Sequence, residues 1–400
     1  MFADRIPGDL STNRLTLAVR QRRASGDPII DLTESNPTRV GLDYPADLLA
    51  PLADRRGLLY APEPLGMFDA RSAVAADYAR RGIPVDPERI ALTASTSEAY
   101  SVLFKLLARP GDEVLVPRPS YPLFELLTTL DGVVARPYDL EYHGSWAIDF
   151  ASVERALSPR TRALLVVDPN NPTGSFTSGE EIERLAAIGA QHGIALIVDE
   201  VFADYELEPG TAPVRPAFLS RSDALVFALG GLSKSIGLPQ AKLAWIAVAG
   251  PAHLVAESLE RLELICDTYL SVSTPVQLAA AELIERGAAI RAQISDRTRN
   301  NYRLLTEAGS SAPSCDVLTA RGGWNAVIRV PTLCSEEELM LTMLTTDGVL
   351  AHPGYFFDFP RESFVIVSLL VTEAAFAAGI KRLFARAVNA YDLGPCGQER

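Results

Sequence analysis

Six short apolar runs alternate with helix-like segments between residues 89 and 250. The runs are RIALT from residue 89, EVLVP from 113, ALLVV from 163, IALIV from 194, ALVFAL from 224 and AWIAVAG from 244. Continuous runs of Val, Ile and Leu at this length are typical of strands that are buried on both faces. The pattern predicts an α/β fold with a mostly parallel central sheet that is sandwiched by helices.

Two segments between these runs have apolar residues at helical spacing, Glu98 to Ala108 and Glu180 to Gly193. Helices that join parallel strands form right-handed crossovers. In sheets of this kind, ligands bind beyond the carboxyl ends of the strands. The residues that directly follow the apolar runs are therefore the first candidates for a functional site.

The pattern changes after residue 285, where a long polar stretch predicts a helix. The runs NAVIRV from 325, GVLAH from 348 and FVIVSLL from 364 then predict further strands. A chain of 400 residues exceeds the length that one hydrophobic core usually serves. We predict an N-terminal arm over residues 1–45 that packs on the small domain, a large domain over 46–285, and a small C-terminal α/β domain over 286–400.

Composition excludes several classes of protein. Hydrophobic residues make up 48% and charged residues 22%, which is typical of a globular enzyme, and the formal net charge of −13 argues against a nucleic-acid surface. The N-terminus lacks an apolar signal segment, and no run approaches the ~20 residues of a membrane span. The four cysteines lie far apart, which suggests no metal site. We expect a cytoplasmic protein with no nucleic-acid or membrane partner.

Lys234 follows the run ALVFAL in the segment GGLSKSIGLP. A reactive lysine needs a lowered pKa, which the sequence does not reveal, so a solvated surface lysine is the alternative. A hydrolase pair of Ser233 and Lys234 is conceivable, although adjacent residues rarely face each other. The segment does not match a phosphate-binding Walker A loop, because no glycine directly precedes Lys234.

Asp199 and Asn171 also follow apolar runs. Asp199 ends IALIVDE, where a carboxylate either caps a helix or keeps a pyridine nitrogen protonated. Asn171 belongs to DPNNPTG, whose composition is that of a turn. A turn explains the composition of this segment but not its position after a strand.

Two further segments are candidates for contacts with a phosphorylated heterocycle. TASTSEAYSVLF places Ser95, Thr96 and Ser97 between a strand and a helix, where hydroxyls and backbone amides form a phosphate site or only cap the helix. Tyr121, in RPSYP, is either a packing residue or an aromatic plate that stacks on a ring.

The order of these motifs along the chain resembles that of the class I/II aminotransferases, the aspartate aminotransferase-like enzymes of pyridoxal phosphate fold type I. The resemblance extends from YAPEPLG at residue 60 to the Pro-Gly of HPGYFF at 353. It implies a pyridoxal 5′-phosphate cofactor that Lys234 holds as a Schiff base, with Lys234 later moving the substrate Cα proton. It also implies that Asp199 pairs with the ring nitrogen and that Asn171 bonds the ring 3′-oxygen.

The resemblance implies the remaining contacts as well. Tyr121 would stack on the ring, and the phosphate would be surrounded by Ser95, Thr96, Ser97 and Ser233. Tyr60 would reach the phosphate of the neighbouring subunit, which implies a homodimer with shared active sites.

Three positions depart from the family pattern. Phe202 stands where the family usually has tyrosine, so one donor to the 3′-oxygen is missing. Lys242 stands where an arginine usually binds the phosphate, and it offers a point charge instead of a bidentate fork. Ile366 stands where the arginine for the substrate α-carboxylate is expected, unless the register of this motif is shifted, and an aliphatic residue cannot make that contact. Either the carboxylate is bound elsewhere, with Arg39 as a candidate, or the substrate has none.

The preferred interpretation is an aminotransferase that moves an amino group between a donor and a carbonyl acceptor, with atypical recognition of the substrate carboxylate. The alternative is a lyase or a C–C bond-forming enzyme with the same fold and cofactor in specialised metabolism. A transcription factor with such a domain would need a DNA-binding extension and a basic face, and the sequence contains neither.

Overall fold

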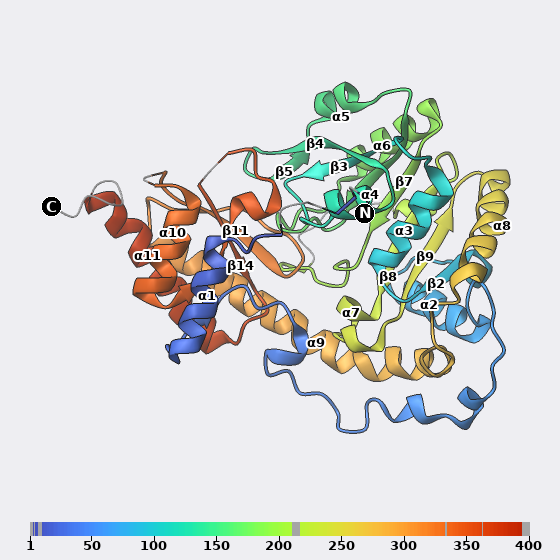
Figure 1. Cartoon of the computed structure of the whole chain (residues 1–400), viewed down its shortest axis with the longest axis horizontal. Helices are drawn as coiled ribbons and strands as arrows, with labels where there is room; N and C mark the ends of the chain where they lie inside the picture. The colour runs from blue at the N-terminus through green and yellow to red at the C-terminus, as the bar shows by residue number, and fades with distance from the viewer. Residues whose placement is uncertain are drawn as a thin grey trace.

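The computed structural model describes residues 3, 5–6, 10–209, 217–332, 334–361 and 363–393. Two lobes lie side by side and are joined by the long helix α9 (Thr274–Ser310) (Figure 1). The large lobe is the eight-stranded sheet with the helices that cover it. The small lobe is the four-stranded sheet with α1 (Arg14–Ser25), α10 (Glu336–Thr342) and α11 (Glu373–Leu393).

The sheet of the large lobe is mostly parallel, which confirms the predicted fold class. Across the sheet, the strands are β2 (Ile90–Thr93), β9 (Ala244–Ala249), β8 (Val226–Gly231), β7 (Ala195–Asp199), β6 (Thr161–Val167), β3 (Glu113–Arg118), β4 (Val134–Tyr142) and β5 (Trp146–Ile148). The five strands from β8 to β4 are parallel. β9 is antiparallel to both β2 and β8, and β5 is antiparallel to β4.

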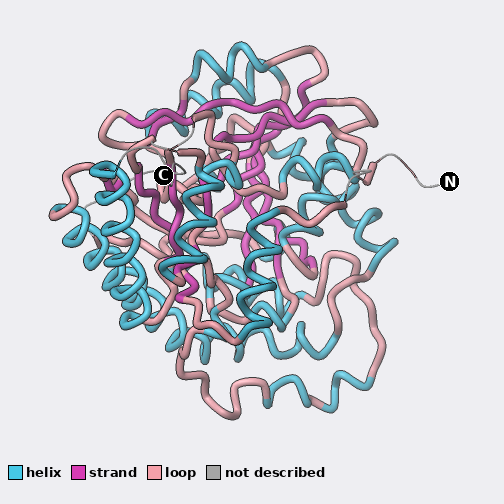
Figure 2. Tube along the Cα trace, turned by 60° about the vertical axis from the view of Figure 1, so that its left-hand side comes forward, coloured by secondary structure: helices cyan, strands magenta, loops and turns pink. Residues whose placement is uncertain are grey.

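Helices cover both faces of this sheet (Figure 2). They are α2 (Phe68–Arg80), α3 (Thr96–Leu107), α4 (Phe124–Leu130), α5 (Phe150–Ala156), α6 (Gly179–His192), α7 (Leu232–Ser235) and α8 (Ala252–Tyr269). Successive side chains of a strand point to opposite faces. Ile197 of β7 therefore packs in a core with residues of α3, α4 and α8, whereas its neighbours Leu196 and Val198 pack with residues of α5 and α6.

Local sequence explains where α6 begins and ends. Ser178 accepts a hydrogen bond from the backbone of Glu181, whose side chain accepts one from the backbone of Ser178, so two free amides of the first turn are satisfied. Gly193 ends the helix with a φ of 63°, a conformation that glycine adopts without strain. The bounds agree with the predicted helix from Glu180 to Gly193 within one residue.

The small lobe is built on an antiparallel sheet in the order β10 (Asp316–Val317), β11 (Asn325–Arg329), β14 (Phe364–Ser368) and β13 (His352–Pro353). β1 (Ile30–Asp31) from the N-terminal segment pairs in parallel with β12 (Val349–Leu350). Leu15 and Leu32 are buried in the core of this lobe. Helix α9 crosses residue 285, so the domain boundaries stay predictions.

Several strands have no clear signal in the sequence. β4 lies next to the edge strand β5, where a proline is tolerated, and it has a mostly exposed or half-exposed pattern that contains Pro137. The predicted strand GVLAH forms two strands of two residues each, β12 and β13, in different sheets. None of the described helices is long and apolar enough to cross a membrane.

Candidate active site

The predicted site residues follow one edge of the large sheet. β2, β8, β7, β6 and β3 all point the same way, because the antiparallel strand β9 separates β2 from β8. Their carboxyl ends lead, in this order, to Ser95–Ser97, Lys234, Asp199, Asn171 and Tyr121. Lys242 precedes the reversed strand β9 and therefore lies at the same edge. The strand order arranges these groups in a row where an α/β sheet binds its ligand.

Lys234 lies in the short helix α7, directly after β8. Its Nζ atom is 4.9 Å from the centre of the Trp324 ring and 5.7 Å from that of Phe202. Burial lowers the pKa of Lys234 from its ordinary value, and the negative charge of Asp199 opposes this change. A lysine with a lowered pKa is more often an unprotonated amine, which can act as a nucleophile or as a base.

The backbone of α7 is held by residues that are distant in the sequence. The hydroxyl of Tyr205 donates hydrogen bonds to the carbonyls of Lys234 and Ser235. The guanidinium of Arg291, from α9, donates to the carbonyl of Ser235 at 2.9 Å. These bonds satisfy the last carbonyls of a four-residue helix, so the position of Lys234 does not depend on the helix alone.

Asp199 is buried at the end of β7. Its Oδ2 atom accepts a hydrogen bond of 2.7 Å from the hydroxyl of Tyr100, and its Oδ1 atom accepts one of 3.1 Å from the amide of Val201. Burial raises the pKa of Asp199, and these two donors oppose the rise because they stabilise the charged form. Tyr100 is itself buried in α3, beside Phe104 and Phe124.

Asn171 lies in the loop after β6, against the small lobe. Its Oδ1 atom accepts a hydrogen bond of 2.6 Å from Nδ2 of Asn325, the first residue of β11. The same loop docks on residues 320–323, because the carbonyl of Gly174 accepts hydrogen bonds from the amides of Arg321 and Gly322, each at 2.9 Å. Gly174 has a φ of 67°, and a Cβ atom there would lie 2.6 Å from the carbonyl oxygen of Gly322. Only glycine allows this close approach.

The start of α3 offers hydroxyls, but one is already used. Ser95 caps the helix by accepting a hydrogen bond from the amide of Glu98 at 3.1 Å, whereas Thr96 is half-buried and Ser97 exposed. Ser233 is half-buried in α7. Lys242 is exposed and has a φ of 54°, so its backbone adopts the left-handed conformation before β9.

Tyr121 lies beyond β3, and 40% of its surface is exposed. Its ring contacts the edge of Phe124, with 6.0 Å between the ring centres. Burial and the charge of Asp199 raise the pKa of Tyr121. Asp199 is therefore near enough to both Lys234 and Tyr121 for its charge to affect the pKa of each.

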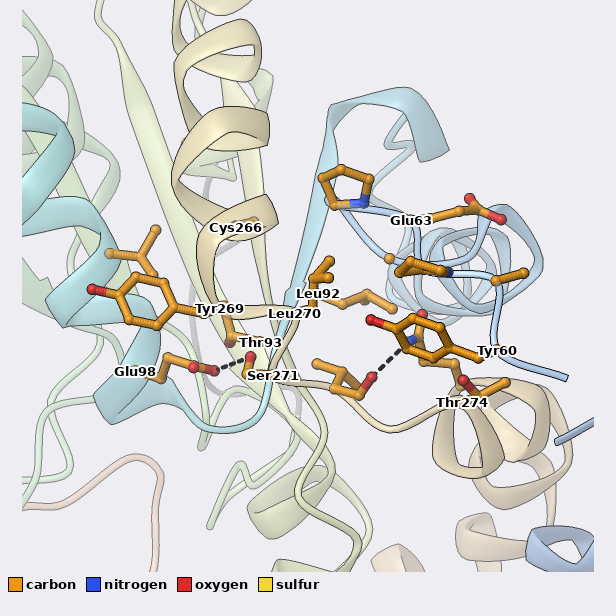
Figure 3. Close-up of a pocket in the computed structure, with 17 residues that line it drawn as sticks. Tyr60, Glu63, Leu92, Thr93, Glu98, Cys266, Tyr269, Leu270, Ser271 and Thr274 are labelled. Atoms are coloured by element: carbon orange, nitrogen blue, oxygen red, sulfur yellow. Dashed lines mark hydrogen bonds between the residues drawn. The ribbon is translucent and has the colours of Figure 1, made fainter. Parts of the chain in front are cut away.

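Tyr60 lies away from this group. It is 75% exposed, and it lines a pocket opposite Glu98, Tyr269 and Ser271 (Figure 3). Glu98 accepts a hydrogen bond of 2.8 Å from the hydroxyl of Ser271. No described contact joins Tyr60 to Lys234, Asp199 or Asn171 within the chain.

The structure shows what surrounds Phe202 and Ile366, two of the positions that depart from the family pattern. Phe202 is buried with its ring edge-on to Trp324, at 5.3 Å between ring centres. Ile366 is completely buried in an apolar cluster with Val327, Phe357 and other residues. β14 contains no basic residue, so the missing arginine does not depend on the register of the motif. Arg39 is exposed, and no described contact joins it to the predicted site.

Comparison with known proteins places the chain in a family. The profile of the family described as aminotransferase class I and II matches residues 28–383. The chain belongs to the class I and II aminotransferases. The predicted family is confirmed.

Relatives of this aminotransferase are similar over most of their length. An alanine aminotransferase of Mycobacterium tuberculosis (strain ATCC 25618 / H37Rv) is 27% identical over 90% of this chain and 86% of its own. A glutamate-pyruvate aminotransferase of Escherichia coli (strain K12) is 26% identical over 86% of this chain and 87% of its own. The predicted enzyme class, a transaminating enzyme, agrees with these relatives.

Solved structures show the same fold. An alanine aminotransferase from Pyrococcus furiosus has a TM-score of 0.85 and 22% identity, and covers 96% of this chain and 99% of its own. A double mutant of the Thermus thermophilus aspartate aminotransferase has a TM-score of 0.82 and 23% identity, and the match covers 96% of this chain and 99% of the other.

Three residues beside the site of the aminotransferase were missed in the sequence. Tyr100 belongs to the segment TASTSEAYSVLF, one helical turn after Thr96. This spacing places both side chains on the same face of the helix and was the signal that could have identified Tyr100. Trp324 and Asn325 follow two glycines, but they belong to the small lobe, and no local pattern relates them to Lys234. Their contacts exist only because the two lobes pack together.

Replacing Tyr100 with phenylalanine tests its support of Asp199. We expect Tyr100→Phe to raise the pKa of Asp199 further and to lower the free energy of unfolding by about 1.5–3 kcal/mol at neutral pH. The hydrogen bond from Tyr100 stabilises only the charged carboxylate of Asp199. The loss of stability in Tyr100→Phe is therefore present above the folded-state pKa of Asp199, and it fades as the pH falls through that pKa and the carboxyl becomes protonated. Urea unfolding of the cofactor-free native and variant proteins over a range of pH measures this difference in the free energy of unfolding.

Tyr138→Phe is the matched control. Tyr138 is also buried, but its hydroxyl donates to the neutral carbonyl of Leu165 at 2.9 Å. Its loss of stability should not depend on the titration of Asp199. Equal pH profiles for the two variants would contradict the assigned role of Tyr100.

Proposed function

We propose that this aminotransferase binds pyridoxal 5′-phosphate through Lys234 and transfers an amino group from an amine donor to a carbonyl acceptor. The observation that carries the proposal is the row of groups along the edge of the sheet, with half-buried Lys234 and buried Asp199 at its centre. The cytoplasm stays the expected location.

The residues along this edge fit the cofactor, both in their chemical groups and in the order in which they would meet its phosphate and its ring. The hydroxyls of Ser95, Thr96, Ser97 and Ser233, together with Lys242, would hold the phosphate at the β2 and β9 side. Asp199 would pair with the ring nitrogen, Asn171 would donate to the 3′-oxygen, and Tyr121 would stack on the ring. Phe202 would supply an apolar contact where the family usually has a hydroxyl. The cofactor, when bound, supplies an electron sink for negative charge that develops at the substrate Cα atom.

Side chains of the protein would move the proton and stabilise the charge of the ring. Lys234 would remove the proton from the substrate Cα atom and return it to the cofactor carbon, a transfer that its lowered pKa favours at neutral pH. Asp199 would supply the negative charge that keeps the ring nitrogen protonated. Tyr100 supports that charge, because it donates to the same carboxylate.

We further propose that the substrate is recognised without an arginine at position 366. β14 contains no basic residue, and Ile366 is enclosed by apolar side chains. On the same face of the sheet, Asn325 pairs with Ser368 and Val327 with Ile366, so these four positions along the two strands carry no charge. An arginine introduced at 366 would be buried in the apolar cluster, so substrates are the better test.

The active unit is proposed to be a homodimer. Leu58, Leu59 and Tyr60 are consecutive, and 85%, 71% and 75% of their surfaces are exposed. Tyr269, which is 55% exposed, lines the same pocket as Tyr60. A second subunit that covers this apolar surface would bring Tyr60 towards the phosphate of its neighbour.

The first test is a half-reaction without acceptor. Purified protein loaded with pyridoxal 5′-phosphate is mixed with L-alanine, L-glutamate, ω-amines or amino sugars. We expect loss of the visible absorbance and formation of pyridoxamine phosphate. Lys234→Ala should slow the reaction by at least about 10²-fold, because it removes the base. The exposed Lys381→Ala variant is the control and should react normally.

Different products would favour the alternative reaction type. Release of ammonia, without pyridoxamine phosphate, would make a lyase the better description. Failure to take up the cofactor, or a Lys234→Ala variant with unchanged spectrum and rate, would contradict the proposed function.

Matched donors test the recognition of the carboxylate. L-Alanine and ethylamine, or L-tyrosine and tyramine, differ only in the α-carboxylate. We expect the half-reaction rates within each pair to agree within about tenfold, because a bidentate arginine contact is worth about 3 kcal/mol or more, or roughly 10²-fold. A preference above 10²-fold for both amino acids would show that a carboxylate site exists elsewhere.

Light scattering tests the homodimer. We expect twice the chain mass of 43.2 kDa for the native protein, and dissociation in Leu59→Asp, because the new charge would be buried in the interface. Leu17→Asp places the same charge on an exposed position of α1 and should remain dimeric. A Leu59→Asp variant that stays dimeric would place the interface elsewhere.

A further inference from the structure

Asn325, in the small lobe, forms a direct hydrogen bond with Asn171, a predicted cofactor contact in the large lobe. Its Nδ2 atom donates to Oδ1 of Asn171 at 2.6 Å. The two side chains come from different lobes and are 154 positions apart in the sequence. The bond therefore depends on how the lobes pack and not on a local turn.

Both ends of this bond are firmly placed. Two hydrogen bonds from the amides of Arg321 and Gly322 to the carbonyl of Gly174 hold the segment before Asn325 against the loop of Asn171. On the neighbouring strand, Ser368 pairs with Asn325, and its hydroxyl donates to the carbonyl of Glu34 at 2.8 Å. These contacts hold the backbone of both segments in place, so the side chains of Asn325 and Asn171 remain within reach of each other.

The bond distinguishes the two ends of the Asn171 amide. A primary amide has one accepting oxygen and one donating nitrogen, and here the oxygen is occupied. No described residue accepts a hydrogen bond from Nδ2 of Asn171. The nitrogen is therefore the end that remains for a ligand, whereas the reversed amide would present its oxygen and repel another acceptor.

We propose that Asn325 is a positioning residue that fixes the orientation of the Asn171 amide, so that its nitrogen donates to the 3′-oxygen of the cofactor. The inference rests on the proposed function of Asn171. It matters more in this chain than in its family, because Phe202 provides no second donor. Asn325 thus sets how strongly that oxygen attracts the neighbouring proton on the lysine nitrogen.

The test is a spectroscopic pH titration of the loaded enzyme. A donor to the 3′-oxygen lowers its basicity, so the cofactor's visible absorbance changes at a lower pH. Asn325→Asp replaces the donor with acceptors, and Asn171 must then turn its nitrogen towards the new carboxylate. We expect the midpoint of the absorbance change to rise by about one pH unit, the equivalent of one hydrogen bond. The dissociation constant for pyridoxal 5′-phosphate should rise about 5- to 10-fold.

The new charge of Asn325→Asp would also raise the midpoint by itself, so the same substitution is made in Asn171→Ala protein. If the shift shrinks in that background, Asn325 acts through Asn171, as proposed. An equal shift with and without Asn171 means that only the charge acts, and the inference is overturned. Asn325→Ala, which leaves Asn171 free to donate, should shift the midpoint less than Asn325→Asp.

Asn13→Asp is the control for an amide-to-acid change, because Asn13 is an exposed cap of α1 and aspartate caps equally well. It should leave the midpoint and the cofactor affinity unchanged. Native protein that titrates normally while Asn325→Asp shows no shift would refute the role of Asn325 and leave the proposed function intact. Native protein that takes up no cofactor through Lys234 would refute both.

Discussion

The direction of the strands is the constraint on which the site depends. Five strands of the large sheet deliver their following residues to one edge, and the single reversed strand between β2 and β8 brings Lys242 to the same edge from its amino end. Groups that are scattered along the chain from Ser95 to Lys242 thereby become neighbours in a fixed order. The helices on both faces bury the sheet and make this edge the place where polar groups can meet a ligand.

Burial then determines the chemical character of the central pair. It raises the pKa of Asp199 and lowers that of Lys234, so it opposes charge on both. Hydrogen bonds from the hydroxyl of Tyr100 and the amide of Val201 stabilise the carboxylate of Asp199, whose charge in turn partly opposes the effect of burial on Lys234. The hydrogen bonds thus favour the charged form of Asp199, and burial favours the neutral form of Lys234, which are the forms that the proposed roles use.

The sequence was sufficient for the fold class, the buried strands and the residues at their carboxyl ends, because each depends on a short pattern. It missed β4, whose half-exposed residues show no apolar run, and it missed Tyr100, whose partner lies on another strand. The positions of Asn325 and Trp324 beside the site could not be predicted from local sequence patterns, because their contacts arise from the packing of two lobes. The enclosure of Ile366 was likewise invisible, although the absence of an arginine was not.

The docking of residues 320–323 has a mechanical consequence. Gly174 and Tyr205 of the large lobe bond to the backbone of this segment, whereas another part of the small lobe meets the large lobe through a bond from the amide of Ser120 to the carbonyl of Phe357, at 3.0 Å. A rotation of the small lobe about this segment would preserve the first set of bonds and break the second contact. Such a hinge would open the Tyr121 side of the site while Asn325 and Asn171 stay together.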